Sequence, residues 1–243
     1  MNGKVAIVTG AGRGLGRAIS ERLARDGAAI VANYRNSHAE AEAIVERISA
    51  AGGRAVAVRG DMSEIADIPA VFAAAQDAFG RFDILVNNAG IGISKPFGDL
   101  SEAEYDRLFA ITKGVYFTLQ HAAPRIADGG RIINICTGVS RTWAVGSAAY
   151  AGSKVAIEQF TRSLSKELGS RGVTVNAVLP GLTETDMIAD IPEARRADGV
   201  QRSSFGRLGL PADIADVVAF LASEDARWLT GQSLLANGGS SPP

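Results

Sequence analysis

Apolar and polar positions alternate along the chain in blocks, with short apolar runs separated by longer amphipathic segments. Each run is continuously apolar, which is typical of strands buried on both faces of a parallel sheet. The runs are K-V-A-I-V-T at residues 4–9, A-A-I-V-A-N at 28–33, R-A-V-A-V at 54–58, F-D-I-L-V-N at 82–87, G-R-I-I-N-I at 130–135, V-T-V-N-A-V at 173–178 and S-L-L-A at 233–236. Seven strands alternating with helices predict a doubly wound, parallel seven-stranded α/β sheet with right-handed crossovers.

The segments between the runs have the periodicity of amphipathic helices. Residues 37–51 place four apolar side chains on one side of a helix, namely Ala41, Ile44, Val45 and Ile48. Longer helices are expected at residues 101–126 and 148–168. These two carry more apolar surface than one sheet face would use, at Leu108, Phe109, Val115, Phe117, Val155, Ile157 and Phe160.

Composition indicates one domain and narrows the range of partners. The 243 residues are 47% hydrophobic and show no compositional break, so residues 1–243 are expected to form a single domain. The net charge is −1, and there is no basic tract of the kind that binds nucleic acid or anionic membranes. The expected partners are small molecules and further copies of the same chain.

The sequence has no features typical of a secreted, membrane-spanning, disulfide-bonded or metal-binding protein. The N-terminal apolar run is too short for a signal peptide, and no later run reaches the ~18 residues of a membrane span. We therefore expect a cytoplasmic protein. A lone cysteine, Cys136, excludes an intrachain disulfide, and the two histidines, His38 and His121, are far apart in sequence, so no metal site is predicted.

A glycine-rich segment, T-G-A-G-R-G-L-G at residues 9–16, follows the first predicted strand and leads into a helix. Such a turn directs backbone N–H groups and the positive end of the helix dipole toward one point, which favours a pyrophosphate. Gly10 would allow the tight turn, Gly14 the approach of a ligand, and Gly16 the packing of the helix. Plain loop punctuation is the alternative interpretation. The missing G-K-[ST] ending disfavours a P-loop nucleotidase.

The second predicted strand ends in N-Y-R-N-S, residues 33–37, without the acidic residue that NAD-selective proteins place on the adenosine ribose. Arg13 and Arg35 would instead reach a 2′-phosphate, which favours NADP(H), with NAD(H) also possible. The alternative is that both arginines are simply solvated on the surface.

The stretch A-A-Y-A-G-S-K at residues 148–154 places Tyr150 and Lys154 on one face of a helix. An adjacent ammonium is expected to lower the pKa of the phenol, as a general acid/base working near neutrality requires. Such a pair is also found by coincidence in ordinary helices.

Taken together, these motifs resemble the short-chain dehydrogenase/reductase family, especially members similar to β-ketoacyl-carrier-protein reductase and bacterial glucose dehydrogenase. The resemblance covers essentially the whole chain and implies a Rossmann-type, three-layer α/β/α fold. It rests on T-G-A-G-R-G-L-G, G-D-M-S at residues 60–63, N-N-A-G at 87–90, Y-A-G-S-K at 150–154, P-G-L-T-E-T at 180–185 and R-L-G-L-P-A-D-I-A near the C-terminus.

The resemblance implies a set of cofactor-binding residues. Asp61 is similar to the acid that accepts from the adenine amino group, with the Met62 backbone beside it. Thr185 is similar to the threonine that binds the nicotinamide carboxamide, although a helix N-cap is its alternative role. The full set is Gly10, Arg13, Gly14, Leu15, Gly16, Arg35, Asp61, Met62, Asn87, Ala89, Gly90, Tyr150, Lys154, Pro180, Gly181 and Thr185.

The implied reaction is hydride transfer between the nicotinamide and a carbonyl or alcohol substrate. Tyr150 would give its proton to the developing alkoxide, and Lys154 would also bind the nicotinamide ribose. Family members usually carry a serine thirteen residues before the tyrosine, where this chain has Thr137. Threonine keeps the hydroxyl and adds a methyl group, so we expect activity with an altered substrate fit. Ser140 has the wrong spacing for this role.

A second departure lies in the central helix. Family members commonly read F-x-I-N-x-x-G, whereas residues 109–114 read F-A-I-T-K-G, one residue shorter and without the asparagine. That asparagine helps to hold a water that links the lysine to solvent, in part through its main-chain carbonyl. Ile111 or Thr112 would have to supply this carbonyl, in a helix whose register has shifted.

The substrate is expected to meet a mobile helical lid at about residues 186–206. Candidate apolar wall residues are Ile93, Trp143 and Val145. By resemblance, the chain would form a homotetramer or homodimer. The alternatives to a reductase are a cofactor-binding sensor or structural protein with little turnover, and a lyase or dehalogenase on the same fold.

Overall fold

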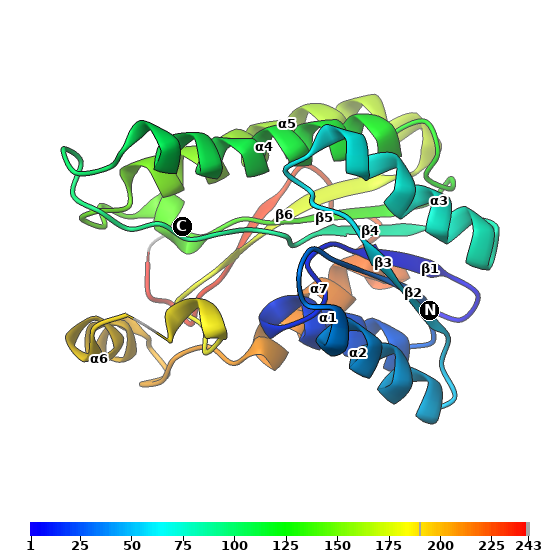
Figure 1. The fold of residues 1–243 in the computed structure, drawn as a ribbon, viewed down its shortest axis with the longest axis horizontal. Coiled ribbons are helices and arrows are strands. Elements are labelled where there is room, and N and C mark those ends of the chain that lie inside the picture. Colours follow the sequence, from blue (N-terminus) through cyan, green and yellow to red (C-terminus); the bar gives the residue numbers. More distant parts are fainter. Residues whose placement is uncertain (190, 242–243) are drawn as a thin grey trace.

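A computed structural model of the chain describes residues 1–189 and 191–241 and contains the predicted sheet (Figure 1). Asp190, which belongs to the predicted lid, and the two C-terminal prolines lie outside the described residues. Within the described part of the chain, no helix is long and apolar enough to cross a membrane.

Seven parallel strands form the sheet in the order β3-β2-β1-β4-β5-β6-β7. They are β1 Val5–Val8, β2 Ala29–Tyr34, β3 Ala55–Arg59, β4 Ile84–Asn87, β5 Arg131–Ile135, β6 Thr174–Pro180 and β7 Ser233–Ala236. All seven predicted strands are confirmed, with ends that differ by at most two residues. The order reverses between β1 and β4, and a crevice opens at such a point beyond the carboxyl ends of the strands.

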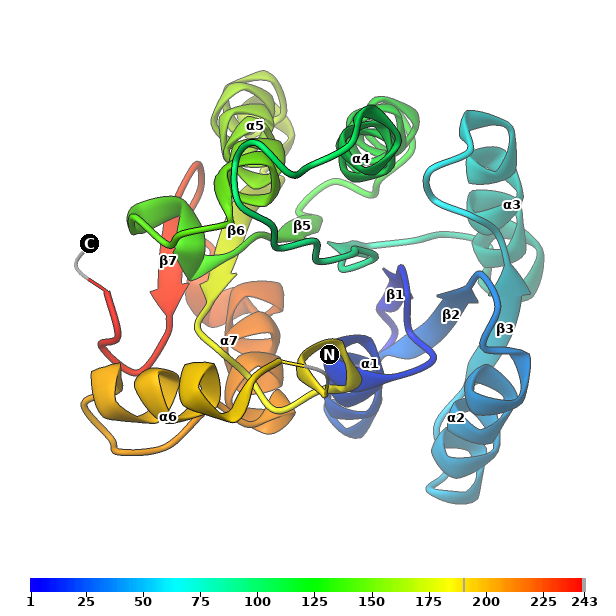
Figure 2. The same cartoon turned by 60° about the vertical axis from the view of Figure 1, so that its left-hand side comes forward.

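Helices cover both faces of the sheet, as Figure 2 shows. One face is packed by α3 Ile68–Phe79, α4 Glu102–Ala122 and α5 Ala148–Glu167, and the other by α1 Gly14–Arg25, α2 His38–Ala50 and α7 Pro211–Ala222. A further helix, α6 Glu193–Arg202, lies at one end of the molecule (Figure 1). The three-layer arrangement follows from strands that are apolar on both sides.

Helix α4 is shorter than the predicted 101–126. It begins with a capping box, in which Ser101 and Glu104 satisfy each other's backbone N–H groups. It ends at Ala122, and Pro124, which cannot donate a helical hydrogen bond, stands in the turn that follows.

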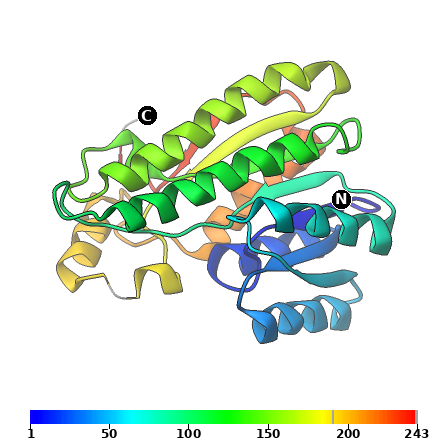
Figure 3. The same ribbon diagram turned by 45° about the horizontal axis from the view of Figure 1, so that its top comes forward.

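The apolar side chains that α4 and α5 carry are buried to different degrees. The two helices run side by side over the sheet (Figure 3), and most of the seven apolar side chains named above are buried or half-buried. Val155 is exposed, as is Tyr116, whose ring packs edge-on against Phe117 and Phe160. The buried or half-buried members are Leu108, Phe109, Val115, Phe117, Ile157 and Phe160.

Gly114 brings the backbone of α4 against the loop that follows β3. A Cβ atom at this position would lie 1.7 Å from the carbonyl oxygen of Met62, so no side chain fits unless the helix or the loop moves. The contact holds α4 close to the edge of the sheet where β3 ends.

Replacing Gly114 by alanine should therefore destabilise the protein by about 3 kcal/mol, the cost of overpacking a site that cannot relax. The control is Gly152→Ala in α5, where a Cβ atom would meet nothing within 4 Å. That change should stabilise by up to ~1 kcal/mol because alanine favours a helix. Urea unfolding of both variants measures the difference, and equal effects would contradict the packing argument.

Candidate active site

The turn after β1 is joined by hydrogen bonds to the segment that follows β4. Gly10 has φ +63°, a backbone conformation that other residues avoid. The Thr9 hydroxyl oxygen accepts hydrogen bonds from the N–H groups of Asn88 and Ala89, both at 3.0 Å. The Asn88 amide donates to the carbonyl oxygens of Thr9 and Gly10 at 2.9 and 3.1 Å. Sequence reasoning missed Asn88, whose only signal was the doubled asparagine of N-N-A-G.

Helix α1 begins directly against this turn. A Cβ atom on Gly16 would lie 2.2 Å from the Gly10 carbonyl oxygen, so this glycine lets the helix start where it does. Arg13 occupies the N-cap position without a side-chain capping bond, and Leu15 lies partly buried in the first turn. The N–H groups at this helix start have no partner within the helix, which makes them available to an anion.

Asn33 connects the end of β2 to the same turn. Its side-chain oxygen accepts from the Gly10 N–H at 3.3 Å, and its amide donates to the Gly60 carbonyl oxygen at 3.0 Å. Nearby, Ser37 precedes α2 at the N-cap without making a capping hydrogen bond. A Cβ atom on Gly12 would lie 2.8 Å from the Ser37 Cβ, so this hydroxyl group stands beside the glycine turn. Neither side chain belongs to a motif that the sequence pattern indicates.

Arg35 and Asp61, which were assigned to different parts of a dinucleotide, contact each other. Arg35 Nη1 lies 3.3 Å from Asp61 Oδ2, while Ser63 donates to Asp61 Oδ1 through its N–H at 2.9 Å and its hydroxyl at 2.6 Å. Burial alone would raise the pKa of Asp61, but these hydrogen bonds and the Arg35 charge hold it below its ordinary value. Met62 is buried next to this pair, and Arg13 is exposed on the glycine turn.

Asn87 has a structural partner in the neighbouring strand β5. It donates to Asn134 Oδ1 at 2.8 Å, and Asn134 in turn donates to the Thr161 hydroxyl at 2.8 Å. This buried chain of hydrogen bonds joins β4, β5 and α5. Three residues later, Gly90 leaves room for Lys154, because a Cβ atom there would lie 3.3 Å from Lys154 Nζ.

The structure brings Thr137, Tyr150 and Lys154 together at the end of β5. Thr137 follows the strand by two residues, and its hydroxyl lies near enough to the Tyr150 phenol to lower the pKa of that phenol. Lys154 is 6% exposed and donates from Nζ to the carbonyl oxygen of Ile135 at 3.1 Å. Ser140 is not a substitute for Thr137, because its hydroxyl donates to the Thr137 carbonyl oxygen at 2.8 Å.

The direction of the Tyr150 pKa differs from the sequence prediction. Burial raises this pKa, the Thr137 hydroxyl lowers it only in part, and the nearby Cys136 raises it further. Burial likewise lowers the pKa of Lys154. The expectation that the ammonium lowers the pKa of the phenol is therefore wrong for the protein chain itself, in which the loss of hydration dominates.

Thr185 stands across the crevice beside the glycine turn. A Cβ atom on Gly14 would touch the Thr185 methyl group at 3.4 Å. Thr185 precedes a short 3-10 helix, η4 Asp186–Ile188, but makes no capping hydrogen bond to it, which weakens the N-cap interpretation. Pro180 ends β6, and the Gly181 N–H donates to the Ala236 carbonyl oxygen of β7 at 3.1 Å.

Thr112, in the shortened motif of α4, makes a contact that the sequence did not predict. Its hydroxyl donates to the main-chain carbonyl oxygen of Ser153 at 3.0 Å, next to Lys154. The helix runs without interruption from Glu102 to Ala122. The missing asparagine therefore leaves a direct contact between α4 and α5, and any effect on a proton relay stays a prediction.

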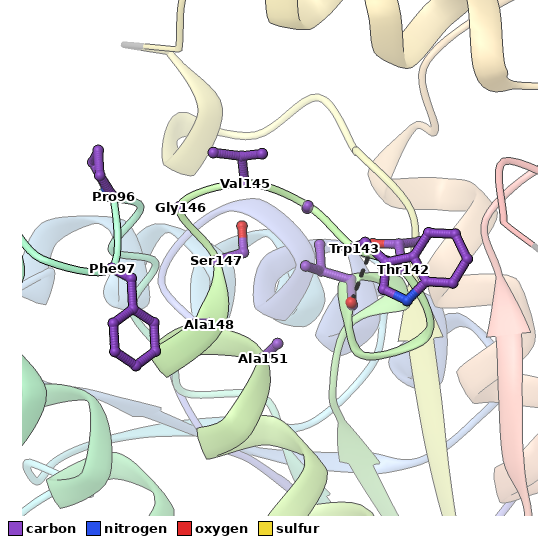
Figure 4. Close-up of a pocket in the computed structure, with 11 residues that line it drawn as sticks. Pro96, Phe97, Thr142, Trp143, Val145, Gly146, Ser147, Ala148 and Ala151 are labelled. Carbon is purple, nitrogen blue, oxygen red and sulfur yellow. Dashed lines mark hydrogen bonds between the residues drawn. The ribbon is translucent and has the colours of Figure 1, made fainter.

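An apolar cavity of about 400 Å³ adjoins the start of α5. Trp143 and Val145 line it, as predicted, and their side chains are 100% and 88% exposed. Ile93 is not among its lining residues, whereas Phe97 is, a residue that the sequence analysis missed. Figure 4 shows Phe97 and Trp143 on either side of Ala148 and Ala151. Neither ring is covered, so both are available to a ligand.

Metal ligands do not gather in this region. Among residues 1–189 and 191–241, no group of three or more His, Cys, Asp or Glu side chains could hold a metal ion. His38 instead hydrogen-bonds the Tyr34 hydroxyl. Burial raises the pKa of the Cys136 thiol to about 12, so this cysteine remains protonated and unreactive.

Comparison with known proteins places the chain in a family. The family model described as enoyl-(acyl carrier protein) reductase matches residues 10–241. An uncharacterized oxidoreductase of Methylorubrum extorquens is 44% identical, with 98% of both chains covered. A hydroxynaphthalene reductase-like protein of Metarhizium brunneum is 39% identical over 98% of this chain and 95% of its own.

Solved structures agree with these relatives. The angucycline C-6 ketoreductase LanV with bound NADP superposes with a TM-score of 0.94, at 41% identity, covering 98% of this chain and 96% of LanV. Another structure of LanV contains NADP and rabelomycin. The glycine turn, the Tyr150 and Lys154 pair and these matches together show that the chain belongs to the short-chain dehydrogenase/reductase family.

Proposed function

We propose that this chain is an NADP(H)-dependent carbonyl reductase in which Tyr150 is the general acid. The observation that carries the proposal is the meeting of Thr137, Tyr150 and Lys154 at the end of β5, across the crevice from the glycine turn. The Thr137 hydroxyl and the Tyr150 phenol can both hydrogen-bond a substrate oxygen. The buried Lys154 amine can bind the hydroxyls of a ribose or a main-chain carbonyl oxygen.

The residues around the crevice fit a dinucleotide. The free N–H groups at the start of α1 and the glycine turn suit a pyrophosphate. A 2′-phosphate would fit between Arg13, Arg35 and the Ser37 hydroxyl, which makes no capping hydrogen bond to α2. Guanidinium groups and hydroxyls bind phosphate oxygens well. Asp61 supports the adenine end, and Thr185 the carboxamide. LanV binds NADP, which supports the same preference here, with NAD(H) as a weaker alternative.

The cofactor supplies a hydride to the carbonyl carbon, and the chain's own residues manage the oxygen. Tyr150 donates its proton to that oxygen as negative charge develops there. Thr137 hydrogen-bonds the same oxygen and orients the phenol. Lys154 is held by the Ile135 carbonyl oxygen next to Gly90, where a ribose would lie. A raised pKa suits Tyr150 as an acid, because the phenol is fully protonated at neutral pH.

The apolar cavity favours a flat, hydrophobic ketone. Phe97, Val139 and Trp143 offer aromatic and aliphatic surface beside the start of α5, the helix that carries Tyr150, and no lining residue is charged. LanV is named an angucycline C-6 ketoreductase, and the Metarhizium brunneum relative is named hydroxynaphthalene reductase-like. Residues 186–206 would close over such a substrate as a lid. The exposed Tyr116 and Val155 would join α4 and α5 to a second copy in a dimer or tetramer.

A cofactor-binding sensor with little turnover is the second candidate. Its support is Thr112, which stands where the family has asparagine and whose hydroxyl proton is committed to the Ser153 carbonyl oxygen. A lyase or dehalogenase is disfavoured, because the glycine turn and both Tyr150 and Lys154 are retained.

The first experiment follows NADPH oxidation by its near-ultraviolet absorbance with cyclohexanone, 1-tetralone, a β-ketoester and a quinone. We expect turnover with the aromatic ketone. Tyr150→Phe should reduce kcat by roughly 10²- to 10⁴-fold, the contribution of a positioned acid, and leave NADPH binding nearly unchanged. Binding without turnover of any ketone would favour the sensor, and full activity of Tyr150→Phe would exclude the assigned acid.

The pH dependence follows from the Tyr150 pKa, which burial raises above its ordinary value of 10.0. Reduction uses the protonated phenol, so kcat/KM for the ketone should stay level through neutral pH and fall only in alkaline solution. Oxidation of the alcohol uses the phenolate and should rise over that same alkaline range. A reductive rate that already declines near neutrality would contradict this direction.

Cofactor preference tests the two arginines. Removing both in Arg13→Ala/Arg35→Ala should weaken NADPH binding at least about tenfold, since a hydrogen bond to a charged group contributes ~1.5–3 kcal/mol. NADH affinity should change little. Arg17→Ala, which removes an exposed arginine one turn further along α1, is the control and should affect neither cofactor. Equal losses for NADPH and NADH would show that the arginines do not recognise the 2′-phosphate.

A further inference from the structure

A buried carboxylate on α5 lies outside the reaction described above. Glu158 is one turn beyond Lys154 and two turns beyond Tyr150, so all three share a helix face. Its side chain is 2% exposed and lies within 2.5 Å of Arg141 Nη2 through Oε2. Its other oxygen, Oε1, has no hydrogen-bond partner among the described residues.

Such a carboxylate is costly to bury for stability alone. A buried ion pair often contributes less than well-packed apolar side chains would, because both charges lose their hydration. Here only one carboxylate oxygen is satisfied, and Arg141 remains 37% exposed. The ion pair therefore needs a reason other than stability.

Arg141 ends the turn that begins at Thr137. In the 3-10 turn η2 Gly138–Arg141, the Val139 N–H donates to the Thr137 hydroxyl oxygen at 3.3 Å. The Ser140 hydroxyl donates to the Thr137 carbonyl oxygen at 2.8 Å. These short-range bonds hold the turn in one conformation. The position of Arg141 at its end therefore constrains the position of Thr137 at its start.

The same turn forms one side of the apolar cavity. Val139 belongs to it, and Thr142 and Trp143 follow Arg141 directly; all three line the cavity. The turn is also confined from the other side, because a Cβ atom on Gly138 would lie 3.1 Å from the Pro180 carbonyl oxygen. The ion pair is the charged link that fastens this unit to α5.

We propose that Glu158 is a positioning residue that, through Arg141, holds the Thr137 turn and the cavity wall against the helix carrying Tyr150 and Lys154. This inference rests on the proposed reductase function. Glu158 does not touch the substrate. It fixes the distance between the Thr137 hydroxyl and the Tyr150 phenol, the two groups that meet the substrate oxygen.

The test compares Glu158→Gln and Arg141→Met/Glu158→Gln with the wild-type protein, using 1-tetralone and NADPH. Each variant should lower kcat by about tenfold to a hundredfold, the effect of a small misplacement of a reacting group. The double variant should lose no more than Glu158→Gln does, since both changes break one link. NADPH affinity, measured by fluorescence, should stay the same. Because the double variant leaves no unpaired buried charge, it keeps the test valid if Glu158→Gln unfolds.

A second comparison separates positioning from a general structural effect. In a Thr137→Val background, Glu158→Gln should have almost no further effect on kcat, because it acts through the missing hydroxyl. Asp83→Asn is the control for a buried, ion-paired carboxylate at the opposite end of β4. It should lower the melting temperature but leave the kcat of the folded protein unchanged. Arg141→Lys should retain most of the activity.

Two outcomes would overturn the inference. One is a wild-type kcat in Glu158→Gln with only a lower melting temperature, as expected for Asp83→Asn. The other is an equal loss of kcat with and without the Thr137 hydroxyl. Absence of turnover in the wild-type protein would instead refute the proposed function, so the two failures are distinguishable.

Discussion

The rest of the site depends on the position of helix α5 relative to β5, α4 and the turn after β5. Four polar contacts fix it, from Lys154 to β5, from Ser153 to α4, from Thr161 to β5 and from Glu158 to the turn after β5. Apolar packing alone would allow the helix to slide or rotate by small amounts, because dispersion forces have little direction. Hydrogen bonds on three successive turns of the helix remove that freedom.

The same burial sets the chemistry of the residues on this helix. Taking Tyr150 out of water favours its protonated form, and taking Lys154 out of water favours its neutral form. A carbonyl oxygen of β5 and the nearby Cys136 oppose the second effect. The fold itself thus keeps Tyr150 protonated, as an acid for reduction must be. For the reverse reaction Tyr150 would have to be a phenolate, and a positive charge from outside the chain would be needed to stabilise it.

Much of this could be predicted from the sequence, because its signals are local. Seven apolar runs located the strands, and the glycine turn and the Tyr150 and Lys154 spacing located the site. The contacts that fix the site were beyond reach. Asn88, Ser37, Phe97 and Glu158 belong to no periodic pattern, and their roles depend on which distant backbone atoms the fold places beside them. The pKa of Tyr150 was assigned in the wrong direction because a one-dimensional spacing reveals a neighbouring charge but not the loss of water.

The pairing of β1 with β4 also has a consequence for how the molecule is made. The two strands are adjacent in the sheet, yet Thr9 contacts Val86 across 77 residues of chain, so the turn after β1 is complete only when this distant segment arrives. Parallel pairings over such separations form slowly, because a long loop must close before any contact rewards it. During synthesis, the nucleotide crevice can take shape only after β4 has emerged and joined β1. A ligand can therefore bind this crevice only after β1 and β4 have paired. It stabilises the paired strands and does not guide their pairing.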